Sequence, residues 1–102
     1  MTVKLYPNEV VIKAGDTNQL IENIKINGKL ILTNQRIYFK TLSDETEKFN
    51  FEILFDNILE VIFYGKGIFA ARGLQIVTRD GRTHSFPLRE RDEIGKLINR
   101  MY

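Results

Sequence analysis

The alternation of apolar and polar residues predicts that most of this chain forms short β-strands. Residues 9–13 contain three consecutive β-branched residues, and turn-forming residues stand on either side, at Pro7-Asn8 and Gly15-Asp16. Residues 20–26 alternate only in part and form the next expected strand. We therefore expect two short strands at the start of the chain, separated by a turn at Gly15-Asp16.

The clearest hairpin pairs residues 29–32 with residues 37–40 around Asn34, whose side chain tolerates the left-handed conformation. Each strand has an apolar face, formed by Leu30 and Leu32 on the first and by Ile37 and Phe39 on the second. The other side chains of the second strand are expected to point outward, namely Arg36, Tyr38 and Lys40.

Two further strands are expected in the middle of the chain. Residues 49–55 place four large apolar side chains on one face: Phe49, Phe51, Ile53 and Phe55. Residues 59–64 are largely apolar on both faces, so we expect this strand to be covered on each side. The acidic residues 43–48 are expected to form a surface loop.

The last hairpin joins residues 73–78 to residues 83–88 through Asp80-Gly81, a strong turn signal. A two-residue loop would set Ile76 against Ser85. A three-residue loop, with Gly81 in the left-handed conformation, sets Ile76 against His84. Only the second register keeps all the apolar residues on one face, namely Leu74, Ile76, Phe86 and Leu88. We therefore expect the second register.

The end of the chain is expected to be helical. Apolar residues recur with the spacing of one helix face at Ile94, Leu97, Ile98 and Met101. Gly95 weakens this helix by about 1 kcal/mol relative to alanine, so tertiary packing must compensate. The strands and the single amphipathic helix indicate an α+β fold, mostly β, in which the helix covers one end of a bent sheet or of two orthogonal sheets.

Length and composition indicate one domain that spans residues 1–102. The chain has no cysteine and one histidine, which excludes disulfides, thiolate metal sites and paired-histidine metal sites. It has no run of about 18 apolar residues, and residues 1–12 lack the apolar stretch of a signal peptide. We therefore expect a cytoplasmic domain without a metal or cofactor.

The charge is unevenly distributed along the chain. Residues 1–64 hold seven Lys/Arg and nine Asp/Glu, whereas residues 65–102 hold eight and four. A basic region of this kind is typical of proteins that meet an anionic partner, such as lipid headgroups or nucleic acid. The solvated surface of a small basic protein has the same pattern, so charge alone does not identify a partner.

Three segments carry a resemblance to a known family. Residues 28–39 read G-K-L-I-L-T-N-Q-R-I-Y-F, residues 53–61 read I-L-F-D-N-I-L-E-V, and residues 73–86 contain the last hairpin. The first segment resembles the pattern G-x-L-x-L-T-N-x-R of GRAM domains and related bacterial pleckstrin-homology-like domains. The other two are similar to the next blocks of that family, in the same order. The resemblance covers about residues 9–101.

This resemblance implies a pleckstrin-homology-like barrel of about seven antiparallel strands capped by one C-terminal helix. It also implies a non-catalytic module that binds phosphoinositides, other membrane lipids or protein partners. Members that bind phosphoinositides tightly have a basic cluster between the first two strands. Here residues 14–19 hold no Lys or Arg, and the alternative loop, residues 26–29, holds only Lys29. The sequence therefore favours weak association with an anionic membrane surface.

The candidate binding residues lie between residues 65 and 82. Phe69 stands between glycines with basic residues on either side, as in a loop that dips into a membrane. The alternative is that Phe69 belongs to the core at the start of the sixth strand. The Asp80-Gly81 turn carries two more arginines. The residues expected to contact a lipid headgroup or a partner are Lys66, Phe69, Arg72, Arg79 and Arg82.

Other functions have weaker support. His84 has no nucleophile paired with it by motif, and Gly65-Lys66-Gly67 lacks the rest of a phosphate-binding loop, so we expect no enzyme. Tyr38 between two basic residues is typical of stacking on nucleic acid, but the isoelectric point near 9.0 is modest, so we do not expect that partner. A module for protein interaction or homo-oligomer assembly, pairing through a strand edge, stays open as the alternative to a peripheral membrane role.

Overall fold

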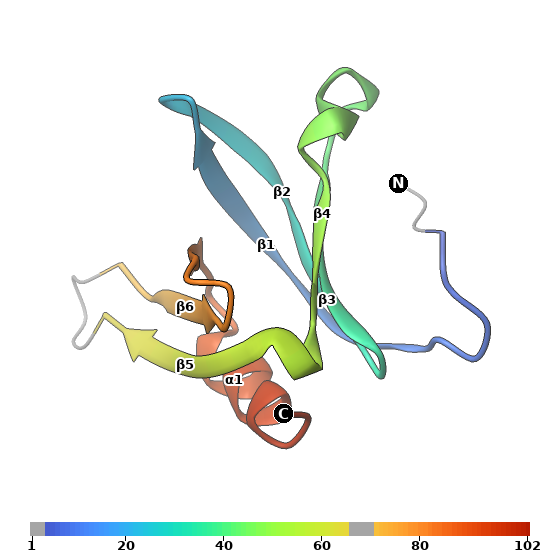
Figure 1. Ribbon diagram of the computed structural model, residues 1–102. Helices are drawn as coiled ribbons and strands as arrows, with labels where there is room; N and C mark the ends of the chain where they lie inside the picture. Colours follow the sequence, from blue (N-terminus) through green and yellow to red (C-terminus); the bar gives the residue numbers. More distant parts are fainter. Residues whose placement is uncertain (1–3, 66–70) are drawn as a thin grey trace.

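The computed structural model describes residues 4–65 and 71–102. Within these residues, seven strands precede one helix, as the sequence predicts (Figure 1). The strands are β1 (Val11–Ile21), β2 (Ile24–Thr33), β3 (Arg36–Thr41), β4 (Phe51–Leu54), β5 (Ile58–Tyr64), β6 (Gly73–Thr78) and β7 (Thr83–Pro87), and the helix is α1 (Arg91–Asn99). In this part of the chain, no helix has the length and apolar character needed to cross a bilayer.

The strands form two antiparallel sheets and do not close into the expected barrel. The sheets have the orders β1-β2-β3-β4 and β5-β6-β7, and the 3-10 turn η2 (Phe55–Asn57) leads from one to the other. β1 meets β7 through side chains, because Thr17 Oγ1 donates to Pro87 O and Gln19 Nε2 donates to Ser85 O, both at 2.6 Å. Among the described strands, none of one sheet pairs with one of the other, and an opening lies between β4 and the β6–β7 hairpin.

β1 and β2 form one long hairpin, so the expected turn at Gly15-Asp16 is wrong. Both residues lie inside β1 and pair with β2. The turn lies instead at Glu22 and Asn23, whose φ angles of 52° and 65° are those of a two-residue hairpin loop. The loop between the first two strands is therefore shorter than expected, and it holds no Lys or Arg.

The other two hairpins form where the sequence predicts them, and the last one has the predicted register. In the β2–β3 hairpin, Leu30 lies opposite Phe39. In the β6–β7 hairpin, Ile76 lies opposite His84, and Gly81 has a φ of 88°. The three-residue loop with a left-handed glycine is therefore confirmed.

The core lies between the two sheets and against α1. The apolar faces predicted for the strands supply it, with these side chains buried: Leu30, Leu32, Ile37, Phe39, Ile53, Leu74, Ile76 and Phe86. α1 packs on β5 and β6 (Figure 1) and contributes the buried Ile94 and Ile98, while Leu97 and Met101 are partly buried. The predicted helix face is thus the one that docks.

Two glycines allow segments to approach closely. A Cβ on Gly95 would lie 2.4 Å from the ring of Phe63, so the residue that weakens an isolated helix lets α1 approach β5. A Cβ on Gly15 would lie 2.4 Å from Glu90 Oε2 and 2.9 Å from Leu88 Cδ1. Gly15 therefore serves packing against the segment before α1, not a turn.

In the middle of the chain, one of the two predicted burial patterns is confirmed. The aromatic side chains of Phe49, Phe51 and Phe55 pack against the core as predicted. Ile62 is 38% exposed, so the expectation that residues 59–64 are covered on both sides is wrong. The acidic segment forms an exposed 3-10 turn, η1 (Asp44–Phe49), which begins after Ser43.

Candidate functional site

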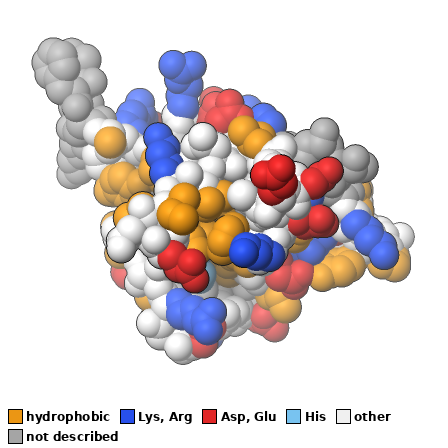
Figure 2. Space-filling view, turned by 90° about the horizontal axis from the view of Figure 1, so that it is seen from above, with side chains coloured by type: hydrophobic (Ala, Val, Ile, Leu, Met, Phe, Trp, Pro, Cys, Tyr) orange, Lys and Arg blue, Asp and Glu red, His pale blue; other side chains and the backbone are white. Residues whose placement is uncertain are grey.

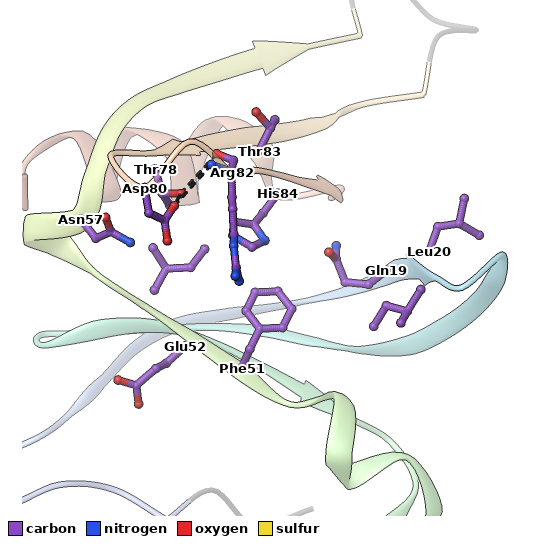
Figure 3. A pocket seen from close by; sticks show the side chains of 12 residues that line it. Gln19, Leu20, Phe51, Glu52, Asn57, Thr78, Asp80, Arg82, Thr83 and His84 are labelled. Carbon is purple, nitrogen blue, oxygen red and sulfur yellow. Dashed lines mark hydrogen bonds between the residues drawn. The ribbon is translucent and has the colours of Figure 1, made fainter.

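A cavity of about 430 Å³ opens at the gap between the two sheets (Figure 3). It lies where the end of β1, strand β4 and the β6–β7 hairpin come together. Its lining residues are Gln19, Leu20, Ile21, Phe51, Glu52, Ile53, Asn57, Thr78, Asp80, Arg82, Thr83 and His84. The volume falls within the roughly 300–1,000 Å³ that is typical of ligand pockets.

The cavity has an apolar wall and a polar wall. β1 and β4 supply apolar groups, among them Ile21, Phe51 and Ile53, whereas the β6–β7 hairpin supplies hydroxyl, carboxylate and guanidinium groups. The two walls meet where the rings of Phe51 and His84 stack, with 5.1 Å between their centroids. A ligand that fills this cavity must therefore present apolar groups on one side and hydrogen-bonding groups on the other.

Arg82 brings a guanidinium group into a cavity whose lining also holds the carboxylates of Asp80 and Glu52. Its side chain extends from the hairpin toward Phe51 (Figure 3). The neighbouring carboxylate of Asp80 is occupied within the turn, where it accepts hydrogen bonds from the Thr78 hydroxyl and from the Arg82 N–H (3.3 Å). The hydrogen bond from Thr78 is the main cause that lowers the pKa of Asp80. Within residues 4–65 and 71–102, no group accepts a hydrogen bond from the Arg82 guanidinium.

His84 contributes an uncharged ring to the same cavity. Burial lowers the pKa of its imidazole below the ordinary 6.5, so the ring is neutral at pH 7. In the described residues, no group of three His, Cys, Asp or Glu side chains is arranged to hold a metal ion. The cavity therefore offers aromatic stacking, hydrogen bonding and the side-chain charges of Arg82, Asp80 and Glu52.

An exposed apolar hairpin tip lies at the same end of the molecule. Leu20 is 73% exposed and Ile24 is 57% exposed, on either side of the β1–β2 turn. Leu20 also lines the cavity together with Arg82, which places the tip and the β6–β7 turn at one end. Seen from above, hydrophobic side chains gather near the middle of the face turned away from α1, with charged side chains around them (Figure 2). Sequence reasoning missed the tip because it placed Leu20 and Ile24 within one strand.

The structure brings together only part of the predicted binding set. Arg79 and Arg82 are both exposed and flank the β6–β7 turn, as the sequence suggests. Arg72 precedes β6 at the opposite end of that strand and pairs with Asp92 at 2.7 Å. Lys66 and Phe69 lie outside the described residues. The two arginines of the turn are therefore the predicted residues that lie beside the cavity.

Arg36 is buried, which corrects the expectation that it points into solvent. Its side chain lies on the outer face of β3, as alternation predicts, but residues 4–10 cover it. The guanidinium donates to both carboxylate oxygens of Glu9, at 2.8 and 3.1 Å. Its Cζ atom lies 4.0 Å from the ring centroid of Tyr6 and 4.7 Å from that of Tyr38. This cation therefore does not serve nucleic-acid or lipid binding.

The neighbouring residues of the T-N-x-R motif hold the same N-terminal segment. Thr33 Oγ1 donates to Glu9 Oε2 at 2.6 Å. The side chain of Asn34 accepts from the Val10 N–H at 2.7 Å and donates to Asn8 O at 3.0 Å. The motif that carries the family resemblance thus has a structural role, because it fixes residues 4–10 across the outer face of the first sheet.

These contacts perturb the ionisation of Glu9. Burial raises the pKa of its carboxyl, but hydrogen bonds from Arg36, Thr33 and the Tyr6 N–H outweigh burial and lower the pKa from 4.5 to about 2. The carboxylate therefore stabilises the folded state only while it is ionised.

We expect this stabilisation to be lost in acid. Because the folded-state pKa lies below the ordinary value, the contribution is complete above about pH 4.5 and disappears as the pH falls toward 2. The urea midpoint of the parent protein should fall across this window. The Glu9→Gln variant, which cannot titrate there, should be less stable at neutral pH and should show a smaller fall. If the urea midpoints of the two proteins fall equally between pH 4.5 and pH 2, ionised Glu9 is not the source of this stabilisation.

Comparisons with known proteins define the fold. No model of a protein family matches the chain, and a search of curated proteins found no match. Solved structures do match, although their sequence identities are low. The crystal structure of the C-terminal domain of an unknown protein from Leishmania infantum matches with a TM-score of 0.76 and 15% identity, over 93% of this chain and 85% of that one.

Two further structures have names that indicate the fold type. The Vps36 N-terminal PH domain matches with a TM-score of 0.71 and 18% identity, over 96% of this chain and 82% of that one. The hSac2 domain from human phosphoinositide phosphatase Sac2 matches with a TM-score of 0.57 and 16% identity, over 95% and 70%. The chain therefore has a pleckstrin-homology-like fold, in which two antiparallel sheets and a C-terminal helix enclose one core without closing into a barrel.

Proposed function

We propose that this domain is a non-catalytic, GRAM-type binding module that associates weakly with anionic membrane surfaces. The observation that carries the proposal is the common location of the apolar tip, Leu20 and Ile24, and the arginines of the β6–β7 turn, Arg79 and Arg82. One structural neighbour belongs to a phosphoinositide phosphatase, a protein that acts on membrane lipids, which fits the same role. We expect the domain to act at the cytoplasmic periphery of a membrane.

The expected affinity is low. Two inserted aliphatic side chains contribute about 1.5–3 kcal/mol each, and each arginine near an anionic surface contributes about 1 kcal/mol. The gross attraction is then about 5–8 kcal/mol, and ordering costs leave a dissociation constant from about millimolar to tens of micromolar. Glu22 in the tip opposes binding by placing a negative charge close to the surface. Stable recruitment would therefore require several copies of the domain.

The sequence-based site is modified rather than replaced. The inserting role that the sequence assigned to Phe69 now has a second candidate in Leu20 and Ile24. The contacts proposed for Lys66 and Phe69 stay predictions, and Arg72 is a weaker candidate because Asp92 pairs with it. The arrangement favours insertion of the hairpin tip, with Arg79 and Arg82 meeting the phosphates.

Vesicle co-sedimentation tests this proposal. The parent protein should bind vesicles that contain an anionic lipid and should not bind purely zwitterionic vesicles. Binding should weaken with added salt, because exposed charges are screened within about 8–10 Å at physiological ionic strength. Leu20→Glu should reduce binding at least about tenfold with little change in melting temperature, since the side chain is exposed.

Val10→Glu is the matched control for this substitution. Val10 is 62% exposed, and its main chain pairs with Asn34 at the opposite end of β2, far from the tip. The control should keep the vesicle binding of the parent, apart from a small loss due to net charge. If the parent ignores anionic vesicles even at low salt, the membrane proposal fails and the protein-interaction alternative replaces it.

A further inference from the structure

We propose that the cavity between β4 and β7 binds an extended acidic peptide segment, which pairs as an added strand with the free edge of β4. The peptide places an acidic side chain at Arg82 and, two residues away, an apolar side chain against Phe51 and Ile21. This inference goes beyond the membrane proposal: the two share Arg82, but the edge of β4 belongs to the cavity alone.

The main chain of Glu52 faces the cavity. Leu42, directly after β3, donates its N–H to the carbonyl oxygen of Asn27 in β2 at 3.2 Å. Because main-chain groups alternate in direction along a strand, the N–H and C=O groups of the even-numbered residues of β3 also point toward β2. The odd-numbered Phe39 therefore shares its hydrogen bonds with Phe51, its partner on β4. By alternation, the N–H and C=O of Glu52 point away from β3, toward the edge that has no strand partner in the described chain.

The side chain of Glu52 supports this assignment. It accepts hydrogen bonds from Arg36 Nη1 at 2.9 Å and from the Tyr6 hydroxyl at 2.5 Å on the outer face of the sheet. Figure 3 shows it pointing away from the cavity. Since Glu52 nevertheless lines the cavity, it does so with its main chain. The cavity thus exposes an unpaired strand edge, the kind of edge that binds peptides by strand addition.

The facing edge of β7 is already occupied along most of its length. The carbonyl groups of Ser85 and Pro87 accept hydrogen bonds from Gln19 and Thr17 of β1, and Pro87 has no N–H to offer. Thr83 is the residue of this edge that lines the cavity. An added strand therefore pairs with β4 and meets β7 only at its beginning.

The free hydrogen-bond donors of the Arg82 guanidinium favour an acidic side chain in the peptide. The carboxylates of Asp80 and Glu52 are both engaged by protein groups, whereas the guanidinium of Arg82 reaches into the cavity without an acceptor among the described residues. Arg82 directly precedes β7, and His84, whose ring stacks on Phe51, lies two residues further along the chain, so the acidic and apolar side chains of the peptide should also be two residues apart. A bound carboxylate would form a charge-assisted hydrogen bond with Arg82.

Other occupants fit less well. An alkyl chain would bury the N–H and C=O of Glu52 without partners, which is costly. A nucleic acid needs several cations along its backbone, and Arg82 is the one Lys or Arg among the residues that line the cavity. A peptide main chain satisfies the strand edge and supplies the anion at the same time.

NMR titration of isotope-labelled protein tests the inference. The probe is the acetylated and amidated peptide Ser-Glu-Ser-Leu-Ser, which has its acidic and apolar residues two positions apart. Saturable shifts are expected for the amides of β4, Thr83 and His84. A peptide with lysine in place of glutamate, and a peptide with a fully N-methylated main chain, should each bind roughly 10- to 100-fold more weakly.

Two arginine variants form a matched pair for this experiment. Arg82→Glu should reduce peptide binding roughly 10- to 100-fold, whereas Arg100→Glu, which makes the same charge change at an exposed position outside the cavity, should leave it unchanged. The inference is overturned if the N-methylated or the lysine peptide binds as well as the parent peptide, or if the shifts lie away from β4. It is also overturned if a soluble short-chain anionic lipid shifts the β4 amides while the peptide does not.

Discussion

Replacing Arg36 with methionine is expected to reduce the free energy of unfolding by roughly 3–5 kcal/mol. The side chains of Arg36 and Glu9 are 4% and 0% exposed, so the variant leaves a buried carboxylate without its cation. Domains of this size are stable by about 5–15 kcal/mol, so much of the total is at stake. Urea denaturation at neutral pH, followed by circular dichroism, measures the loss.

Two further variants identify the cause of this loss. Combining Arg36→Met with Glu9→Gln removes the uncompensated charge and should recover part of the stability. Lys29→Met breaks an exposed pair with Asp16, whose side chains are 42% and 86% exposed, and should cost at most about 1 kcal/mol. If Arg36→Met costs no more than Lys29→Met, the N-terminal segment is not held by this ion pair.

Much of the strand arrangement could be predicted because its causes are local. The register of the β6–β7 hairpin depends on Gly81 and on the alternation of Leu74, Ile76 and Phe86, all within a few residues of the turn. The β2–β3 hairpin depends in the same way on residues around Asn34. Where the turn and the alternation agree, a shift of the strand register by one residue would expose the whole apolar face, so the sequence is compatible with one register.

Features that depend on distant segments could not be predicted. Alternation places Arg36 on the outer face of β3, and only contact with Glu9, 27 residues earlier in the chain, buries it there. Gly15 resembles a turn residue, yet it is required by the approach of Glu90. For Arg36 the local pattern gave the correct strand face, whereas for Gly15 it predicted a turn where the strand continues. In both cases the neighbour that decides the role is far away in sequence.

The candidate site divides in the same way. Arg79 and Arg82 could be predicted together because one turn carries both. The cavity could not, because it joins β1, β4 and β7, and its free edge exists only because the two sheets do not close. The exposed tip at Leu20 became visible only when the first turn was placed at residues 22 and 23. Placing a turn correctly therefore decides whether an apolar residue is assigned to the core or to a binding surface.

Truncating Ile98 to alanine is the second substitution with a large expected effect, about 2–5 kcal/mol of unfolding free energy. Ile98 is fully buried where α1 covers β5 and β6, and Gly95 on the same face touches the ring of Phe63. The tight approach at Gly95 limits how far α1 can shift to fill the space left by the lost atoms. The loss of unfolding free energy should therefore exceed the transfer free energy of those atoms, because a cavity remains.

Lys96→Ala is the matched control within α1. Lys96 is exposed on the opposite face of the helix, and its truncation should change stability by no more than about 0.5 kcal/mol. Urea denaturation of both variants measures the change. If the slope of unfolding free energy against urea concentration is the same as in the parent, the loss comes from packing in the folded state and not from a change in the unfolded state. If Ile98→Ala unfolds at the same urea concentration as Lys96→Ala, α1 is not docked on β5 and β6.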